Sequence, residues 1–527
     1  MFQITLLSVA TVIFLIWTWL KTRLNYWRRL GVKTPPYSLL FGNIKTLALR
    51  QESFARHQQA MYELSKSQRL SYAGYYLLWT PMFLPVDNDI IKSIMQVDFE
   101  HFIDRGMYSN EKVDPLSSHL FSLEGKKWKL LRNKLSPTFT SGKMKMMYET
   151  IVNCTPGLLD AMDKELVHAV DIKEIFARFT TDVIGTCAFG LSCDSMRNPN
   201  SEFRIKGKEI FKSGILENLK QMMSYIMPEF SKLLGFKIVP EDVSKFFMEI
   251  VKDTVAYREK HNTYRKDFMN LLIQLKNKGK LVDDQKLMEQ NITDSQNKIT
   301  MEEIAAQAFI FFEAGFETSS TTMTFCFYEL AKNKSIQDRV RKEIRDVSSK
   351  YNGEVTYDAI MDMNYLDQVL NETLRKYPPL PCLHRKCNKT YKVPGADLIL
   401  EKGMRVTIPV IGIHHDPDYY PDPGKFDPDR FTEENKRNRK QFTFLPFGDG
   451  PRICIGARFG IMQAKIGLIA VLLNYEVSIN AKTVEPLTFE PESFILTTKG
   501  GLWLNVEKLS SEKIFLMKQE EYTEISG

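Results

Sequence analysis

The sequence predicts a mainly α-helical domain with a small β region, preceded by an apolar N-terminal segment. Apolar residues recur every three or four positions, which is the period of one helix face, in the segments 302–333, 335–351 and 357–377. Strand-like alternation is confined to short pieces, at 391–393, 397–400 and 405–409. The first helical segment is long for a globular helix, so we expect it to cross the whole domain.

The first 22 residues predict a transmembrane signal anchor. Residues 3–20 are apolar and uncharged, and a run of about 18 residues is at the short end for a membrane-spanning helix. No basic residue precedes this run and no small-residue cleavage site follows it, which distinguishes it from a secretory peptide. The basic residues that follow are expected on the cytoplasmic side: Lys21, Arg23, Arg28 and Arg29. An interfacial belt is expected from Trp17, Trp19 and Trp27.

The rest of the chain divides by composition. Residues 23–43 form a basic, proline-containing hinge. No Pro/Gly/Ser-rich linker interrupts residues 44–508, so we expect them to form one large domain. Within it, the polar stretch 276–297 predicts a solvated connector. Residues 509–527 form a charged C-terminal extension.

Composition narrows the function classes. The chain has 527 residues, of which 43% are hydrophobic, enough for a sizeable core. The net charge of +7 is modest and no charged block is long enough to indicate a nucleic-acid partner. Seven cysteines without paired spacing argue against a disulfide framework, so the domain is expected in a reducing compartment.

One cysteine stands in a setting suited to metal binding. The segment Phe447-Gly-Asp-Gly450-Pro-Arg452-Ile-Cys454-Ile-Gly456, the cysteine loop, leads directly into a helix-like run at 458–473. Its glycines let the backbone approach a flat ligand, and amide groups at the start of a helix stabilise a thiolate. A buried, inert cysteine in a turn is the alternative for any single cysteine. The spacing favours a metal-bound thiolate, with Arg452 within reach of an anionic group on the same ligand.

The cysteine loop resembles the haem-ligand loop of the cytochrome P450 monooxygenases, Phe-x-x-Gly-x-Arg-x-Cys-x-Gly, at every specified position. The resemblance implies the cytochrome P450 fold, haem b as cofactor, and Cys454 as the axial ligand of the haem iron with Phe447 beside it. Thiolate ligation pushes electron density toward O–O cleavage, so it is the ligand for oxygen activation.

An acid and an alcohol follow each other inside the long helical segment. Glu317 and Thr318 match the family's acid–alcohol pair, which implies that they deliver protons during catalysis. Ala314 lies four residues before Thr318 on the same helix face, where the resemblance places it against the haem. A mid-helix threonine commonly donates to the carbonyl group four residues earlier. We expect instead that the small residues at this turn let the helix open locally and leave room for oxygen and water.

A second motif is interpreted as structural. Glu372 and Arg375 are three residues apart on a predicted helix, which is ordinarily a surface pair of little energetic value. Downstream, the run from Pro423 to Phe431 matches the family's meander signature, Pro-x-x-Phe-x-Pro-x-Arg-Phe. The resemblance implies that Arg430 joins Glu372 and Arg375 in a buried triad that supports the cysteine loop.

The haem propionates require cations or hydrogen-bond donors. Trp128 and Arg132 are spaced to share a helix face, and with Arg452 they match propionate-binding positions of related enzymes. Arg105 and Arg385 occupy further such positions, although a solvated surface residue is the alternative for any single arginine.

Electrons must come from another protein, because the chain lacks a glycine-rich nicotinamide fingerprint. Basic residues flank Trp128 and the cysteine loop: Lys126, Lys127, Lys129, Lys436, Arg437, Arg439, Lys440 and Arg458. Clustered basic residues on a surface are usually in contact with solvent and have no binding role. A basic surface beside the thiolate would, however, attract and orient an acidic electron donor. The resemblance names a membrane-bound NADPH–cytochrome P450 reductase, whose flavins accept electrons from NADPH, with cytochrome b5 as an optional second donor.

The substrate pocket is implied by the resemblance alone. Its residues are mostly apolar, which suits a lipophilic substrate: Met107, Tyr108, Leu120, Phe121, Phe312, Ala314, Leu380, Leu383, Leu496 and Thr497. A nearby apolar patch predicts either core packing or a lid at a lipid-side entrance: Met222, Met223, Tyr225, Ile226, Met227, Phe230, Leu233, Leu234 and Phe236. The adjacent His414 and His415 are interpreted as scaffold, because neighbouring side chains on an extended segment diverge.

The resemblance therefore implies a microsomal monooxygenase anchored in the endoplasmic reticulum membrane with a cytosolic catalytic domain. Residues 309–322 and 377–381 are most similar to insect enzymes that oxidise xenobiotics such as plant toxins or insecticides. Oxidation of an endogenous terpenoid, steroid or fatty-acid-like compound is the alternative. Two other classes are open: a haem-thiolate isomerase or dehydratase would not need Glu317 and Thr318, and a haem-based sensor or carrier would bind without turnover.

Overall fold

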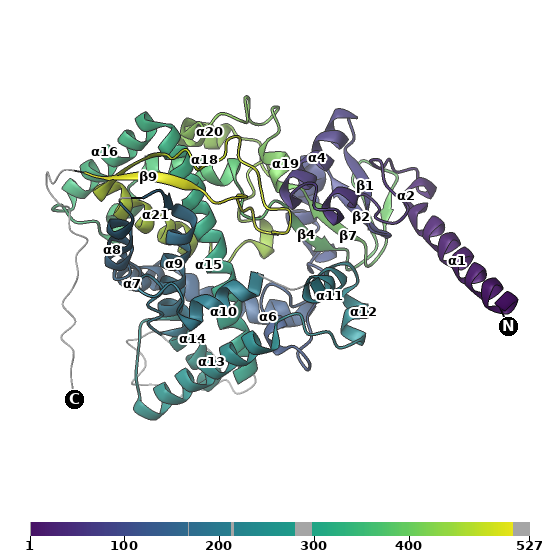
Figure 1. Ribbon diagram of the computed structural model, residues 1–527, viewed down its shortest axis with the longest axis horizontal. Coiled ribbons are helices and arrows are strands. Elements are labelled where there is room, and N and C mark those ends of the chain that lie inside the picture. The colour runs from purple at the N-terminus through teal and green to yellow at the C-terminus, as the bar shows by residue number, and fades with distance from the viewer. Residues whose placement is uncertain (1, 167, 212–214, 280–297, 510–527) are drawn as a thin grey trace.

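The computed structural model describes residues 2–166, 168–211, 215–279 and 298–509 (Figure 1). It confirms a mainly helical fold with small sheets. The longer helices are α1 (Phe2–Leu24), α4 (Phe54–Ser67), α6 (Gly125–Leu135), α7 (Ser141–Val152), α8 (Thr155–Glu165), α9 (Ile172–Ile184), α10 (Glu202–Phe211), α11 (Ile215–Ile226), α13 (Glu241–His261), α14 (Phe268–Lys278), α15 (Met301–Lys332), α16 (Lys334–Lys350), α18 (Asn364–Lys376) and α21 (Ala457–Asn474). The shorter helices are α2 (Tyr26–Arg29), α3 (Lys45–Ala48), α5 (Asn88–Lys92), α12 (Pro228–Leu233), α17 (Tyr357–Met361), α19 (Val410–His414) and α20 (Glu433–Asn438).

The central element is α15, which matches the predicted helix at 302–333 to within one residue at each end. A capping box starts it: the Glu303 amide donates to the Thr300 hydroxyl (3.2 Å), and the Thr300 amide donates to the Glu303 carboxylate (2.8 Å). Its side chains are buried on nearly all sides, because α9, α13, α14, α18 and α21 pack around it. The main apolar core therefore surrounds α15, in the middle of the domain (Figure 1).

Nine strands form three sheets within the described residues. The sheet beside α1 has the order β1-β2-β7-β4 and the second has the order β3-β9-β8, while β5 and β6 pair alone. Their bounds are β1 (Tyr72–Leu77), β2 (Thr80–Pro85), β3 (Val170–Asp171), β4 (Leu383–Lys386), β5 (Tyr391–Lys392), β6 (Ile399–Leu400), β7 (Arg405–Ile408), β8 (Tyr475–Ile479) and β9 (Trp503–Lys508). The three predicted pieces correspond to β5, β6 and β7. The β1–β2 hairpin was not predicted, because consecutive residues are buried on both faces and the two-residue alternation is lost.

The prediction of one helix over 357–377 is wrong. The chain forms α17 and then α18, with a break at Asp362 and Met363. The carboxylate of Glu343, on the neighbouring α16, accepts hydrogen bonds from the amides of Tyr365 (2.7 Å) and Leu366 (2.8 Å). These amides at the start of α18 are thus satisfied by a distant side chain, which local periodicity does not reveal.

The predicted connector at 276–297 is also corrected in part. Residues 276–278 belong to α14, which ends at Gly279 in the left-handed region. Lys276 pairs with Glu259 of α13 at 2.7 Å, so this end of the helix is tied to its neighbour. Residues 280–297 lie outside the described residues, as does the extension from residue 510 onward.

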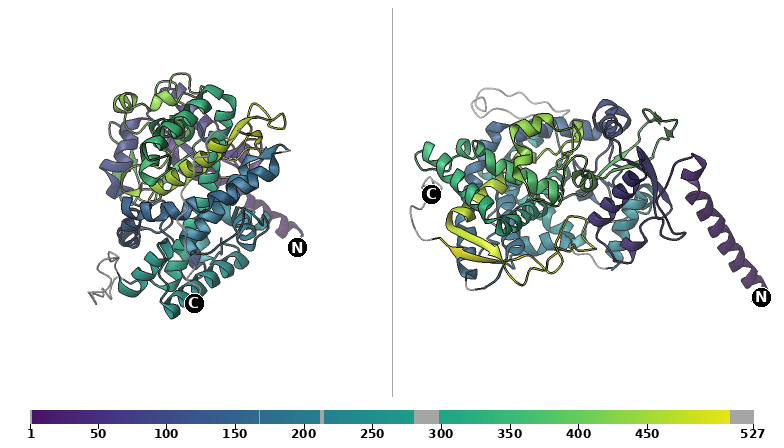
Figure 2. Two further views of the ribbon diagram at one scale, coloured as in Figure 1. Left: turned by 90° about the vertical axis from the view of Figure 1, so that its left-hand side faces the viewer. Right: turned by 90° about the horizontal axis from the view of Figure 1, so that it is seen from above.

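The N-terminal helix α1 projects away from the domain in every view (Figures 1 and 2). Among the described residues, two helices are long and apolar enough to cross a membrane, α1 and α21. In α1, 6% of the apolar 18-residue stretch is buried inside the protein, whereas in α21 the buried share is 67%. Since α21 packs in the main core, α1 is the candidate anchor. The helix continues to Leu24, two residues beyond the predicted boundary at 22.

The placement of Trp27 in an interfacial belt is wrong. Its side chain is fully buried in the domain, where the indole N–H donates to the Tyr75 carbonyl at 3.2 Å. A Cβ on Gly74 would lie 2.3 Å from the Trp27 ring, so β1 approaches this ring closely because residue 74 is glycine. The start of the predicted hinge is therefore packed against the first sheet.

Candidate active site

The cysteine loop closes on itself just before α21 begins. The Cys454 amide donates to the Phe447 carbonyl at 2.9 Å. Gly448 and Gly450 have φ values of +71° and +67°, in the left-handed region. At Gly450 a Cβ would lie 2.0 Å from the Met95 carbonyl oxygen, so no larger residue fits there. These constraints fix Cys454 three residues before the first residue of α21.

Cys454 borders a cavity with about 1820 Å³ of atom-free space between the cysteine loop and α15. The residue is exposed toward this cavity, yet the surrounding protein raises the pKa of its thiol by desolvation. A hydrogen bond from the Gly456 backbone and the charges of Arg105 and Arg132 act in the opposite direction. A bound metal cation would deprotonate the thiol outright, so this setting suits a metal-bound thiolate.

All eight residues predicted to bind the cofactor border the same cavity: Arg105, Trp128, Arg132, Ala314, Arg385, Phe447, Arg452 and Cys454. They come from α6, α15, β4, the cysteine loop and the segment before α6. The Arg452 guanidinium lies 3.9 Å from the centroid of the Trp128 ring, so these two side chains stack. Segments that are distant in the sequence thus meet around one space.

Four guanidinium groups gather at this cavity. Burial lowers the pKa of Arg385 to about 10 and, with repulsion from Arg385, that of Arg452 to about 9. The pKa of Arg105 is lowered well below its usual range by burial and then by Arg452 and Arg385. Asp104 lies 3.7 Å from Arg452, and the buried Arg385 Nε has no hydrogen-bond partner among the described residues. A ligand with two carboxylates would relieve this repulsion, so the residues present fit a haem with its propionates.

The predicted triad is buried except for Arg430, whose side chain is 13% exposed. Glu372 and Arg375 are both fully buried and paired twice, at 2.7 Å and 2.8 Å. The Arg430 Nε lies 3.5 Å from the Glu372 carboxylate, and its Nη2 donates to the Pro421 carbonyl at 2.6 Å. Since none of the three borders the cavity, a supporting role is the interpretation that the geometry favours.

His414 connects this triad to the cysteine loop. Its carbonyl accepts from Arg375 Nη1 (2.9 Å), and its Nδ1–H donates to the Arg375 carbonyl (3.2 Å). Its Nε2 accepts from the Leu445 amide (2.8 Å), two residues before Phe447. Burial lowers the pKa of His414 well below its usual value, so the ring is neutral and serves as both donor and acceptor. Within the described residues, no group of three or more His, Cys, Asp or Glu side chains is placed to hold a metal ion.

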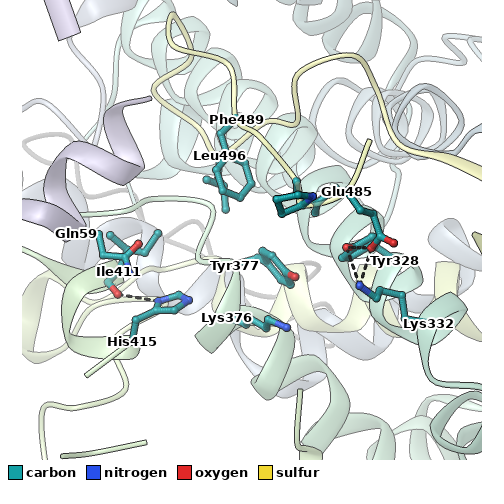
Figure 3. Close-up of a pocket in the computed structure, with 12 residues that line it drawn as sticks. Gln59, Tyr328, Lys332, Lys376, Tyr377, Ile411, His415, Glu485, Phe489 and Leu496 are labelled. Atoms are coloured by element: carbon teal, nitrogen blue, oxygen red, sulfur yellow. Dashed lines mark hydrogen bonds and ion pairs between the residues drawn. The ribbon is translucent and has the colours of Figure 1, made fainter. Parts of the chain in front are cut away.

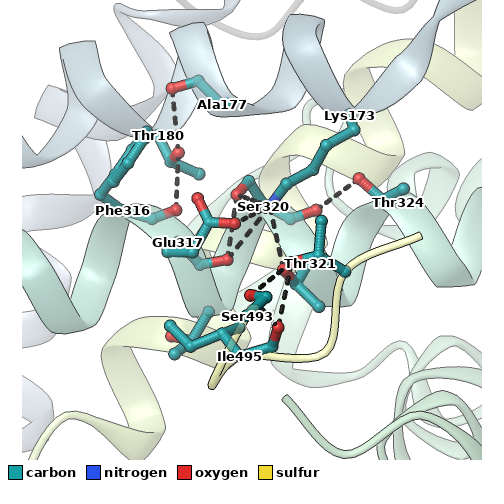
Figure 4. A network of polar contacts seen from close by, with 12 residues as sticks. Lys173, Ala177, Thr180, Phe316, Glu317, Ser320, Thr321, Thr324, Ser493 and Ile495 are labelled. Atoms are coloured by element: carbon teal, nitrogen blue, oxygen red, sulfur yellow. Dashed lines mark hydrogen bonds and ion pairs between the residues drawn. The ribbon is translucent and has the colours of Figure 1, made fainter. Parts of the chain in front are cut away.

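Glu317 and Thr318 differ in their surroundings. Thr318 borders the cavity and donates to the Ala314 carbonyl at 2.5 Å. The local opening expected there is not seen, because α15 is helical throughout Met301–Lys332. Glu317 does not border the cavity, since its carboxylate pairs with Lys173 of α9 at 2.8 Å (Figure 4). Sequence reasoning missed Lys173, which has no local motif to mark it.

Half of the predicted substrate pocket borders the cavity: Leu120, Phe121, Ala314, Leu380 and Leu383. The other five do not: Met107, Tyr108, Phe312, Leu496 and Thr497. Phe312 is fully buried and stacks on Phe316 on another face of α15, whereas Phe311 borders the cavity. One residue corresponds to about 100° around a helix, so Phe311 and Phe312 lie on different faces of α15.

Leu496 lines a second cavity instead (Figure 3). There it lies with Phe489, Tyr377 and His415, while Phe494 of the same loop borders the first cavity. Tyr108 donates its hydroxyl hydrogen to the Phe236 carbonyl, which holds it against the segment after α12. Residues missed by the sequence reasoning include Ile184, Ile310 and Phe268, whose apolar side chains had no motif to single them out.

The apolar patch at 222–236 is buried on one side and exposed on the other. Ile226 is 2% exposed and packs with Ile44 and Leu78, as a core residue does. The Tyr225 hydroxyl lies 2.9 Å from Nε2 of His384, which borders the cavity. Exposed apolar side chains cover the outer side: Met222, Phe230, Leu233 and Leu234. The patch is thus anchored to the first sheet on one side and open on the other.

Some basic side chains of the clusters that flank Trp128 and the cysteine loop contact other residues, whereas others are exposed to solvent. Lys127 pairs with Glu111 (2.7 Å) and Lys436 with Glu433 (2.8 Å). Arg439 stacks on Phe431, with 4.1 Å between its guanidinium and the ring centroid. The residues Lys126, Lys129 and Arg458 are exposed, the first two on α6 and the third on α21.

Comparison with known proteins agrees with this geometry. The sequence profile of the family described as Cytochrome P450 matches residues 33–505. Probable cytochrome P450 6a14 of Drosophila melanogaster is 45% identical over 493 residues, covering 92% of this chain and 96% of that protein. Cytochrome P450 6a2 of the same species is 44% identical, with coverage of 92% and 96%. Cytochrome P450 6A1 of Musca domestica is 42% identical, with coverage of 92% and 94%.

Proposed function

Because the chain belongs to the cytochrome P450 family and is a monooxygenase, we propose that it inserts one atom of O2 into lipophilic xenobiotics, such as plant toxins or insecticides. In this proposal NADPH supplies the electrons through a flavin-containing reductase. Haem bound at Cys454 supplies the activation of oxygen. The arrangement that carries the proposal is the single cavity bordered by Cys454, four arginines and Thr318.

The residues of the chain perform three tasks in this reaction. Cys454 donates electron density as a thiolate, and the cysteine loop holds it at a fixed place before α21. The arginines Arg105, Arg132, Arg385 and Arg452 hold carboxylate groups at the cavity wall. Thr318 holds a hydroxyl group at the cavity, where it passes protons that Glu317 collects.

The cavity lining supports a lipophilic substrate. Apolar side chains from several elements border it, including Ile184, Phe311, Leu380 and Phe494. Such a surface binds a substrate mainly by shape and burial rather than by directed hydrogen bonds. The named relatives are insect proteins, which supports the xenobiotic class; an endogenous terpenoid, steroid or fatty-acid-like substrate is the alternative outcome.

The proposal also places the protein on the endoplasmic reticulum membrane with its domain in the cytosol. The exposed apolar surface of α1 and the basic Lys21 and Arg23 at its end support this orientation. The exposed Lys126, Lys129 and Arg458 provide a basic surface near the cysteine loop for an acidic reductase. Cytochrome b5 would use the same surface as a second donor.

The test is turnover of the full-length protein in microsomes with the reductase, NADPH and isotopically labelled O2. We expect one labelled oxygen atom in products of plant toxins or insecticides, detected by mass spectrometry. Labelled products only from terpenoids, steroids or fatty acids would support the alternative substrate. Rearrangement of a peroxide without NADPH would identify an isomerase or dehydratase, and binding without turnover would identify a carrier or sensor.

The Thr318→Ala variant tests the role of the hydroxyl group. We expect the product formed per NADPH to fall by roughly tenfold or more, because general acid catalysis commonly contributes 10²–10⁴-fold. Hydrogen peroxide should account for the lost electrons. The control is Thr322→Ala, which removes a second hydroxyl bordering the cavity that bonds to the Thr318 carbonyl (2.9 Å). Equal losses in both variants would contradict a specific role for Thr318.

A further inference from the structure

The second cavity has the size and lining of a site for a small organic molecule. It contains about 1050 Å³ of atom-free space between α4, the C-terminal end of α15, the end of α18 and the segment that joins β8 to β9. Its floor is buried, since Tyr328, Tyr377 and Leu496 are only 3–8% exposed. Lys332 and Glu485 stand at its rim, with side chains 42% and 40% exposed. A concave site with a buried apolar floor and a few polar groups is typical of ligand binding.

The charges around this cavity cancel in pairs. Lys332 lies 2.6 Å from Glu485, and Lys376 lies 2.8 Å from the buried Glu329. In the described part of the chain, Lys376 Nζ donates a hydrogen bond to Glu329 alone, so two of its three hydrogens are available to another acceptor. An uncharged ligand with an acceptor group therefore fits better than an ion, because burying an unpaired charge is costly.

His415 provides a hydrogen-bond acceptor inside the cavity. Its Nδ1–H donates to the Ile411 carbonyl at 2.9 Å. Burial, with the nearby Arg375, lowers the pKa of His415 to about 4, so the ring is neutral and Nε2 carries no hydrogen. Among the described residues Nε2 has no hydrogen-bond partner. Figure 3 shows His415 and Lys332 toward opposite ends of the cavity, with Tyr377 between them.

One loop separates the second cavity from the first. Residues 485–499, the dividing loop, turn back on themselves and pair antiparallel at Phe489. Phe489 and Leu496 of this loop line the second cavity, whereas Phe494 borders the first. The Leu496 amide donates to the carbonyl of Pro379 (3.0 Å), which also borders the first cavity. A molecule that contacts Phe489 and Leu496 therefore holds the part of the chain that shapes the first cavity.

We propose that the second cavity binds a small, uncharged phenolic compound, whose hydroxyl group donates to His415 Nε2 and whose carbonyl oxygen accepts from Lys376, and that this ligand tightens binding in the first cavity. Its ring lies against the aromatic side chains of Tyr328, Tyr377 and Phe489. The bound ligand orders the dividing loop, so a molecule that enters the first cavity loses less entropy in ordering it. The consequence for turnover rests on the proposed function, whereas binding in the second cavity does not.

The first experiment measures binding with umbelliferone, a planar phenol whose carbonyl oxygen lies at the end opposite to its hydroxyl group. Equilibrium dialysis of the full-length holoenzyme in lipid vesicles, without NADPH, gives the Kd, with protein-free vesicles as the blank. We expect umbelliferone to bind at least about threefold more tightly than coumarin, which lacks the hydroxyl group, because one hydrogen bond is lost. His415→Phe should abolish this difference. Lys376→Met should weaken both compounds to a similar extent, because both carry the carbonyl oxygen.

The second experiment measures the effect on the first cavity with phenylimidazole, whose ring nitrogen binds the haem iron and shifts the Soret band. We expect saturating umbelliferone to lower the Kd of phenylimidazole by roughly fivefold or more, which is the lower end of common coupling between two sites. Leu487→Trp fills the second cavity and should remove both umbelliferone binding and this effect. The matched control is Val484→Trp on the same segment, which is 61% exposed, borders neither cavity and should leave both intact.

The outcomes are distinguishable once haem content and the Kd of phenylimidazole alone show that each variant is folded. Equal binding of umbelliferone to Leu487→Trp and to the wild type would place the probe elsewhere and overturn the site. A raised Kd of phenylimidazole that persists in Leu487→Trp would show competition in the first cavity, which also overturns it. Binding without any change in the Kd of phenylimidazole would overturn the effect on the first cavity. If umbelliferone binds as expected but the wild type forms no oxygenated product, the proposed function fails and the second site stands.

Discussion

Replacing Cys454 with serine is expected to abolish oxygenated product and the strongly red-shifted Soret band of the reduced protein under carbon monoxide. A serine hydroxyl stays protonated and is a weak donor to iron, so the electron density that a thiolate supplies is lost. The loss should exceed the roughly 10–100-fold that removal of an outer-shell group costs at a metal site. The absorption spectrum and the labelled-product assay measure the two effects separately.

The matched control for this variant is Cys382→Ala. Cys382 borders the same cavity and is buried, and burial raises the pKa of its thiol with no opposing cation. The structure therefore describes it as a packed thiol, and its replacement should leave the red-shifted band in place. Persistence of the band in Cys454→Ser, or its loss in Cys382→Ala alone, would show that the iron ligand has been assigned to the wrong cysteine.

The Arg375→Met variant is expected to lower the free energy of unfolding by about 3–5 kcal/mol, because it leaves the fully buried Glu372 without its cation. Three carbonyl groups also lose their donor, at His414, Pro423 and Lys425. The measurement is urea unfolding followed by circular dichroism, with haem content determined on the same sample. Haem should be lost at a lower urea concentration than helical structure, because His414 connects Arg375 to Leu445 and the cysteine loop.

Two further variants separate this effect from a general loss of charge. Arg339→Met removes an exposed arginine paired with Asp429 at 3.4 Å and should change the free energy of unfolding by about 0–1 kcal/mol. The double variant Glu372→Gln/Arg375→Met should be less unstable than the sum of the single variants, because no unpaired charge is left buried. A simple sum would indicate that the two residues are not coupled in the folded state.

Local sequence was sufficient for features whose residues are contiguous. The cysteine loop gathers its glycines, Arg452 and Cys454 within ten residues, and the local backbone alone brings them together. The long helix α15 was predicted to within one residue at each end, since its capping box at Thr300 and Glu303 and its apolar period are both local. For these elements, the order of residues along the chain is enough to predict the local geometry.

The tertiary structure decided what depends on the relative placement of elements. The separation of α17 from α18 depends on Glu343 of another helix, and the phase of α15 turned Phe312 away from the cavity and Phe311 toward it. The surroundings of Glu317 depend on Lys173, which is 144 residues away in the sequence. Sequence therefore determined the family, the loop and the main helix of this protein. Packing decided which side chains meet, because contacts between distant segments are set by how helices are oriented against one another and not by the local order of residues.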